Sequence, residues 1–138
     1  MAAKDVFHNN VKSALQKDGW QITHDPLYLN FGGVEMYIDL GAQKLIGAER
    51  CGEKIAVEIK SFLGNSTISE FHTAIGQFIN YRVALKATEA ERILYLAVPL
   101  ETYNTFFTLR FTQMVLAENQ IKLLVFNPNE EVISKWEK

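Results

Sequence analysis

A strand, a helix and a second strand follow one another in the middle of the chain, and this succession restricts the fold more than any other feature. Residues 54–60 alternate between apolar and polar side chains, as a half-buried strand does. Residues 67–85 carry apolar side chains at helical spacing, and residues 93–98 form the short apolar run typical of a central strand. A helix that connects two strands packs on a sheet, so the sequence predicts an α/β domain.

The remaining elements extend this sheet on both sides. Further helices are predicted at residues 5–18 and 101–118, and further strands at 21–24, 34–40, 45–50 and 121–126. Strands 45–50 and 54–60 are expected to form a hairpin that turns at Cys51 and Gly52. The tail after residue 129 is left open, as a last strand or as a segment packed on the surface. Hairpins followed by helical crossovers predict a mixed sheet flanked by helices.

Two helices carry the clearest local signals. Thr67 with Glu70 has the spacing of a capping box, which marks the start of a helix. The apolar side chains of that helix are Ile68, Phe71, Ile75, Phe78 and Ile79. Those of helix 101–118 are Tyr103, Phe106, Phe107, Phe111, Met114 and Val115. Both sets are expected to face the core.

Size and composition fit a single domain that covers residues 1–138. The 138 residues are 48% apolar and 22% charged, which suffices for a packed core without metal or disulfide support. A single cysteine excludes an internal disulfide framework and suits a reducing compartment. No apolar run approaches the roughly 18–20 residues of a membrane span, and the first residues lack a hydrophobic signal core. A cytoplasmic protein without a membrane partner is therefore expected.

Candidate chemistry concentrates in Asp39 and in the tripeptide Glu58-Ile59-Lys60. Two positions apart on a strand, Glu58 and Lys60 point to one face, roughly 6–7 Å apart. If Asp39 lies on the adjoining strand, two carboxylates and the Ile59 carbonyl are suitable ligands for Mg²⁺ or Mn²⁺, and the lysine can stabilise a developing charge. Such a group could hydrolyse phosphodiester bonds.

An isolated Glu-x-Lys is more often part of a solvated strand face. Three observations favour a site here: Asp39 stands at the end of its strand, Glu58 and Lys60 lie in an otherwise interior strand, and a helix follows directly. Other polar residues receive weaker assignments. Asp5 and His8 share a side of the first helix, where a carboxylate favoured by the helix dipole and a surface histidine are the simpler reading. Glu35 is expected to be solvated or to support Asp39.

Glu49 is expected to pair with Lys54 across the hairpin and is the reserve ligand if the strand register differs. His24 and His72 are isolated, and no His/Cys cluster has the spacing of a zinc site. Cys51 has no assignable partner for nucleophilic chemistry.

This order of elements resembles the PD-(D/E)XK nuclease core, with Asp39 on one strand and Glu58-x-Lys60 on the next. Ile38 replaces the usual proline before the aspartate. Gln77 and Tyr81 match the Gln-x-x-x-Tyr that some branches carry on the following helix, and one helical turn separates them. The resemblance implies that both could face the site; the alternative is a surface amide and a packed aromatic ring.

The whole chain is also similar to the XisH family, the fdxN element excision controlling factors. The segments that carry this similarity are AAKDVFHNNVKSALQKDGWQITHDPL, EKIAVEIKSF and GQFINYR. It implies a role in programmed excision of a DNA element, with DNA, a companion excision factor and a site-specific recombinase as partners. Enzymes that cut both strands are often dimers, so a homodimer is the default expectation.

Two functions remain open at this point. One is a Mg²⁺-dependent endodeoxyribonuclease, with RNA as the alternative substrate. The other is a catalytically silent accessory module that binds DNA or a partner protein. The formal net charge of −2 favours the second function, since proteins that track DNA are often strongly basic. The retained Asp, Glu and Lys favour the first, because burying charges without a use costs stability.

Overall fold

The computed structural model describes residues 5–45 and 52–138. Its helical elements are α1 (His8–Lys17), α2 (Thr67–Thr88), α3 (Leu100–Thr102), the π-helical turn η1 (Tyr103–Phe107) and α4 (Arg110–Glu118). Its strands are β1 (Gln21–His24), β2 (Leu27–Phe31), β3 (Val34–Ile38), β4 (Leu40–Leu45), β5 (Gly52–Ile59), β6 (Arg92–Pro99), β7 (Leu123–Asn127) and β8 (Val132–Glu137). No helix in these two ranges is both long enough and apolar enough to span a membrane.

A six-stranded sheet in the order β1-β4-β5-β6-β7-β8 forms the centre of the fold, and β2 with β3 forms a separate hairpin. Strands β5, β6 and β7 run parallel, because α2 and the segment α3–η1–α4 return the chain to the same edge. The pairs β1/β4, β4/β5 and β7/β8 are antiparallel. The predicted mixed sheet flanked by helices is confirmed, and the tail forms a strand.

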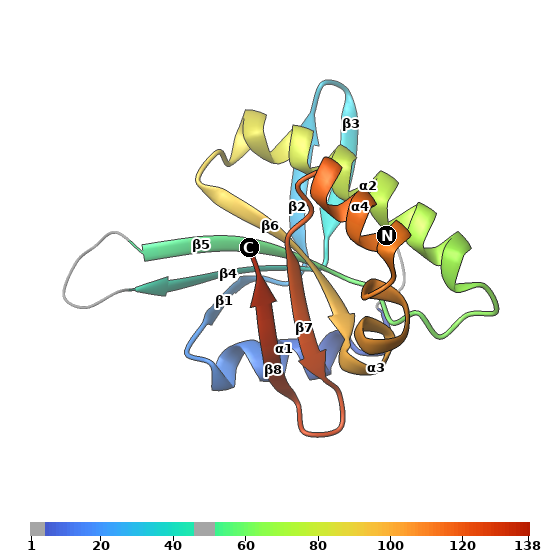
Figure 1. Cartoon of the computed structure of the whole chain (residues 1–138). Coiled ribbons are helices and arrows are strands. Elements are labelled where there is room, and N and C mark those ends of the chain that lie inside the picture. Colours follow the sequence, from blue (N-terminus) through green and yellow to red (C-terminus); the bar gives the residue numbers. More distant parts are fainter. Residues whose placement is uncertain (1–4, 46–51) are drawn as a thin grey trace.

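Helices cover both faces of this sheet (Figure 1). Helix α1 packs Val11 and Leu15 on one face, against Val57 and Ile59 of β5. Helix α2 and the segment η1–α4 cover the other face, where the second apolar core lies. The alternation predicted for residues 54–60 is confirmed, since Ala56 and Glu58 lie on the face opposite Val57. Glu58 is therefore in a covered layer and is only 6% exposed.

The single strand predicted at residues 34–40 is wrong. The chain forms β3 as far as Ile38 and β4 from Leu40, in two different sheets, with Asp39 between them. Ile38 is buried on the α2 side and Leu40 on the α1 side, whereas one straight strand would place both on the same face. The alternation of apolar and polar side chains does not reveal that the chain passes from one sheet to the other at Asp39. The residues before and after Asp39 each fit a strand by themselves.

Two further strand predictions need correction. The partner of β5 is β4, at residues 40–45, and not the predicted segment 45–50. Residues 46–51, with the predicted turn at Cys51 and the predicted pair of Glu49 with Lys54, lie outside the described residues. Among the described residues, Nζ of Lys54 lies 3.3 Å from a carboxylate oxygen of Glu91. Strand β2 was not predicted, because the proline at position 26 suggested an interruption there.

The predicted cap of α2 is wrong by one residue. Ser66 is the N-cap residue, and its hydroxyl accepts a hydrogen bond of 3.2 Å from the backbone N–H of Ser69. Glu70 accepts a hydrogen bond of 3.1 Å from the N–H of Gly64 and so fixes the loop before the helix. The side chains of Ser66 and Glu70 mark the start of α2. Thr67 is the first helical residue and not the cap.

Replacing Ser66 by alanine is expected to lower the free energy of unfolding by about 1 kcal/mol, because a helix-terminal N–H loses its acceptor. Denaturant titration followed by circular dichroism would measure this difference. Ser134→Ala, at an exposed position of β8, is the matched control and is expected to stay within about 0.5 kcal/mol of wild type. Equal stability of the two variants would contradict the assigned cap.

The last predicted helix, at residues 101–118, is interrupted. A π-helical turn spans Tyr103–Phe107, and Leu109 is extended at φ −68° and ψ 146° before α4 begins. The interruption shifts the helical phase, so that of the apolar residues predicted in the second half only Val115 packs on the core. Phe107 is fully buried, whereas Phe111 and Met114 are 55% and 53% exposed.

Candidate functional site

Asp39 and Glu58 meet at one end of the six-stranded sheet. Leu40 at the start of β4 pairs with Val57 of β5, so Asp39 lies beside the last residues of β5. Its Oδ2 atom accepts a hydrogen bond of 2.7 Å from the backbone N–H of Ile59. Since β4 does not extend far enough to pair with Ile59, the carboxylate satisfies an N–H group that the sheet leaves free.

Glu58 and Lys60 lie on the face covered by α2. The Oε2 atom of Glu58 is 3.9 Å from Nζ of Lys60, whose side chain is 24% exposed. The Oε1 atom of Glu58 is buried and has no hydrogen-bond partner among the described residues. An unpartnered buried acceptor is costly, so this position is suited to bind a proton or a cation. The convergence predicted for Asp39, Glu58 and Lys60 is therefore present in the geometry.

The two carboxyl groups strongly affect each other. Burial, followed by the charge of Asp39, raises the pKa of Glu58 to about 9. Burial also raises the pKa of Asp39, although the hydrogen bond from Ile59 acts in the opposite direction. Two adjacent carboxylates in a covered layer repel each other, and a retained proton removes part of this repulsion. The pair consequently holds a proton at neutral pH.

Tyr81 lies close enough to this pair to respond to its charge. Burial raises the pKa of Tyr81 to about 12, and the charges of Glu58 and Asp39 contribute in the same direction. Gln77 is half-buried one turn earlier on α2, and its side-chain oxygen is buried without a partner among the described residues. Within residues 5–45 and 52–138, Gln77 forms no side-chain hydrogen bond to Asp39 or Glu58. The electrostatics therefore place Tyr81 near the pair, whereas no interaction of Gln77 with it is found in that part of the chain.

Asp5 places a further carboxylate near this pair, on the same side of the chain as Asp39. Its Oδ2 atom accepts a hydrogen bond of 3.0 Å from the N–H of Ser61, and Oδ1 accepts one of 2.9 Å from the N–H of Phe7. The N–H groups of Ile59 and Ser61 point to one side of an extended chain, so Asp39 and Asp5 lie on the same side of Lys60. The negative charge of Asp5 contributes to the raised pKa of Asp39.

The expectation of an ordinary surface histidine at position 8 is wrong. His8 is 3% exposed, and its Nε2 atom lies 2.6 Å from Oδ1 of Asp25. The other oxygen of Asp25 accepts a hydrogen bond of 2.8 Å from Nζ of Lys12. The helical spacing of His8 with Val11 and Leu15 could have indicated its burial, but the partner Asp25 follows only from the packing of α1 on the loop after β1.

The remaining polar candidates lie apart from the acidic pair. Glu35 is exposed on the β2–β3 hairpin, which agrees with a solvated side chain. His24 is exposed and lies 2.9 Å from the hydroxyl of Thr23, and His72 is exposed on α2. Neither histidine joins a metal-binding group of three or more side chains, and no such group occurs within residues 5–45 and 52–138.

The donor set at the sheet end nevertheless fits Mg²⁺ or Mn²⁺. These ions prefer oxygen ligands, and Mg²⁺ often binds proteins through only one or two carboxylates while it retains several waters. Asp39 and Glu58 supply two adjacent carboxylates, one of which has a buried oxygen without a partner. The Ile59 carbonyl is the third expected donor. A dication at this position would replace the shared proton.

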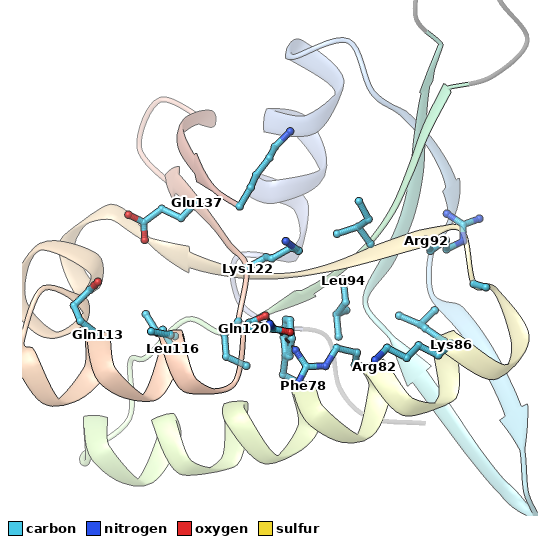
Figure 2. Close-up of a pocket in the computed structure, with 16 residues that line it drawn as sticks. Phe78, Arg82, Lys86, Arg92, Leu94, Gln113, Leu116, Gln120, Lys122 and Glu137 are labelled. Carbon is cyan, nitrogen blue, oxygen red and sulfur yellow. Dashed lines mark hydrogen bonds between the residues drawn. The ribbon is translucent and has the colours of Figure 1, made fainter.

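A cavity of about 920 Å³ lies at the opposite end of the sheet, where β6 and β7 begin (Figure 2). Its basic lining includes Arg82, Lys86 and Lys122. Arg82 donates hydrogen bonds to the carbonyls of Asn119 and Gln120 at the end of α4, and Lys86 lies in the last turn of α2. Cations are favoured at helix C-termini, so the positions of Arg82 and Lys86 are explained without a bound ligand. The acidic pair is therefore the better candidate for chemistry.

Fold and site together define an α/β protein with a buried glutamate, a half-buried aspartate and a lysine at one end of a mixed sheet. The chain belongs to the XisH family, since the family model described as XisH protein matches residues 1–134. The chain matches no curated protein sequence at a significant level.

Two solved structures resemble the chain over nearly its full length. An XisH family protein from Nostoc punctiforme PCC 73102 is 58% identical, with a TM-score of 0.88 over 97% of this chain and 100% of that chain. An fdxN element excision controlling factor protein from Anabaena variabilis is 57% identical, with a TM-score of 0.88 over 98% of this chain and 100% of that chain.

Proposed function

We propose that this chain is a metal-dependent, endonuclease-like factor that hydrolyses phosphodiester bonds during programmed excision of a DNA element. The observation that carries the proposal is the meeting of Asp39, Glu58 and Lys60 at the end of β4 and β5. The Asp directly before β4, the strand with Glu-x-Lys and the helix that follows it support a core of the PD-(D/E)XK type. The excision role is taken from the Anabaena variabilis relative, which is named for it.

Each residue of the cluster has a distinct proposed role. Asp39 and Glu58, with the Ile59 carbonyl, would hold the cation. A bound Mg²⁺ or Mn²⁺ supplies charge neutralisation at the scissile phosphate and lowers the pKa of a bound water. Lys60 is partly exposed and adjoins Glu58, so its ammonium can orient the attacking water or stabilise charge on the phosphate oxygens.

Tyr81 and Gln77 are proposed to face the substrate from α2. The raised pKa of Tyr81 keeps its hydroxyl protonated, so that it can donate a hydrogen bond to a phosphate oxygen. The unpartnered side-chain oxygen of Gln77 can accept a hydrogen bond from a water or a base edge. Both roles are secondary to those of the acidic pair and the lysine.

Replacing Lys60 by methionine is expected to reduce cleavage at least about 100-fold, because the charge that stabilises the transition state is removed while the aliphatic stem remains. Purified protein is incubated with Mg²⁺ or Mn²⁺ and labelled duplex, single strand, flap and four-way junction DNA, with an RNA duplex as an additional substrate. Lys86→Met, which removes an exposed lysine at the far end of the sheet, is the matched control and should cleave like wild type.

The absence of cleavage by folded wild-type protein on every substrate would overturn the proposal. Cleavage that survives Lys60→Met unchanged would also remove the assigned site from the reaction. Cleavage of RNA alone would retain the chemistry and change the substrate.

A second candidate function is an accessory module that binds DNA or a partner protein without cutting. It is favoured by the net charge of −2 and by the small number of protein ligands at the site. The recombinase would then perform the strand breakage, with the companion factor as a partner and this chain as a homodimer. A gel-shift assay with the same DNA panel in Mg²⁺ distinguishes the two, since binding without cleavage in the presence of the metal supports the accessory function.

A further inference from the structure

The proposed reaction leaves one buried polar side chain near the acidic pair without a role. His8 lies in the first turn of α1 and donates through Nε2 to Asp25, at 2.6 Å. Burial acts to raise the pKa of Asp25, but the hydrogen bonds from Lys12 and His8 outweigh it, and the pKa is lowered. Asp25 is therefore a carboxylate that only accepts hydrogen bonds, so Nε2 of His8 must carry the hydrogen.

This arrangement leaves Nδ1 of His8 as the free ring nitrogen. Nδ1 is buried and has no hydrogen-bond partner among residues 5–45 and 52–138. To fix α1 to the loop before β2, His8 needs only its Nε2 atom. If this were its whole role, Nδ1 would be expected to have a hydrogen-bond partner in the protein, as most buried polar atoms do. An unpaired buried nitrogen costs free energy, and a water or ligand atom at that position would recover it.

His8 also lies next to the proposed site. Asp5, one turn earlier, accepts the hydrogen bond from Ser61, the residue after Lys60, and so holds the start of α1 against the end of β5. The strand pairs His24/Gly41 and Leu27/Ile38 place Asp25 opposite the segment that carries Asp39, so the His8–Asp25 pair lies beside Asp39. The electrostatics agree, because a positive charge on His8 would lower the pKa of Asp39. Among the described residues, Asp25 contacts the ring, Lys12 adjoins it through Asp25, and Asp39 lies within range of its charge.

We propose that His8 is the general base of the site: Nδ1 accepts the proton of the attacking water, and Asp25 positions the ring and stabilises the imidazolium. The inference rests on the proposed hydrolysis. The water oxygen forms a bond to phosphorus, the bond between phosphorus and the leaving oxygen breaks, and one water proton passes to Nδ1. The leaving oxygen takes a proton from solvent, after which His8 returns its proton to water, so atoms and charge balance. Lys12 fixes the ionised state of Asp25.

Single-turnover cleavage tests this role with His8→Gln and Asp25→Asn, beside Glu58→Gln and the exposed histidine variant His72→Gln. His8→Gln is expected to lower the rate constant about 100-fold or more, with unchanged substrate affinity and unchanged Mg²⁺-dependent melting temperature. Asp25→Asn is expected to lower the rate about 10-fold or more while substrate affinity is retained, because the imidazolium loses its counter-charge. His72→Gln should match wild type.

Four results would overturn the inference. If wild type cleaves, Glu58→Gln does not and His8→Gln retains the wild-type rate, the proposed function stands and the role of His8 fails. A loss of rate in His8→Gln that is matched by losses of substrate affinity and melting temperature would assign a structural role to the ring. No cleavage by wild type overturns both proposals. Should His8→Gln fail to fold, Asp25→Asn decides, and its cleavage at the wild-type rate would reject the role.

Discussion

Glu58→Gln is expected to raise the melting temperature of the metal-free protein at pH 8 by about 5 °C or more, and to abolish both cleavage and stabilisation by Mg²⁺. Glutamine keeps the shape of the side chain but cannot ionise, so it removes the repulsion between Glu58 and Asp39. The same change removes a proposed ligand. A gain in stability together with a loss of cation response is the mark of a site that is strained in the absence of its ligand.

The direction of the pH dependence follows from the raised pKa of Glu58. The folded protein keeps the proton on Glu58 up to about pH 9, whereas the unfolded chain releases it near the ordinary value of 4.5. The folded state therefore binds more protons between these values, and the free energy of unfolding contributed by Glu58 decreases as the pH rises. This contribution is fully present below pH 4.5 and is lost as the pH passes about 9.

Thermal unfolding from pH 5 to pH 9 is measured first in EDTA and then after Mg²⁺ is added in excess. The two series give the pH dependence of stability and the stabilisation by Mg²⁺. Wild type should lose stability over this range and Glu58→Gln should lose less. Mg²⁺ should stabilise wild type more at pH 8 than at pH 6, because it competes with the shared proton. Glu118→Gln, at an exposed position of α4, is the matched control. A variant that melts below wild type at pH 8, or that retains the Mg²⁺ response, would contradict the assigned pair.

Arg92→Met is expected to lower the free energy of unfolding by about 3 kcal/mol, which corresponds to roughly 10 °C in melting temperature. The Arg92 side chain is buried, and its Nη1 atom donates to the carbonyls of Ile55 at 2.9 Å and Ala42 at 3.3 Å. Its Nε atom donates to Glu89 at 2.7 Å. Methionine fills much of the volume but leaves these carbonyls without a charged donor.

Arg110→Met is the matched control for this change, because Arg110 is exposed at the start of α4. It should unfold within about 0.5 kcal/mol of wild type. Denaturant titration of both variants gives the difference directly. Equal stability would show that water replaces the Arg92 donor without cost. Because Arg92 is not one of the residues of the proposed site, a destabilised variant that still binds Mg²⁺ would separate the stability of the sheet from the site.

The order of elements could be predicted from sequence because the relevant signals are local. The alternation in residues 54–60, the helix-start signal of Thr67 with Glu70 and the apolar run of β6 each depend on neighbours within a few positions, and they suffice for a mixed sheet flanked by helices. The same local pattern placed Glu58 and Lys60 on one face of β5. The two breaks after Ile38 and Phe107 were not predicted, because the residues around them fit a continuous strand and a continuous helix equally well.

The sequence by itself determined which side chains could form a cation site and that Glu58 and Lys60 would share a strand face. Only the tertiary structure decided that Asp39 turns out of the β3 hairpin to accept the N–H of Ile59. It also decided that the loop carrying Asp25 meets His8 on α1. Contacts between residues about 20 positions apart depend on which strands pair and where each strand ends. No period or spacing within one segment contains that information, since the pairing is selected by the packing of the whole core.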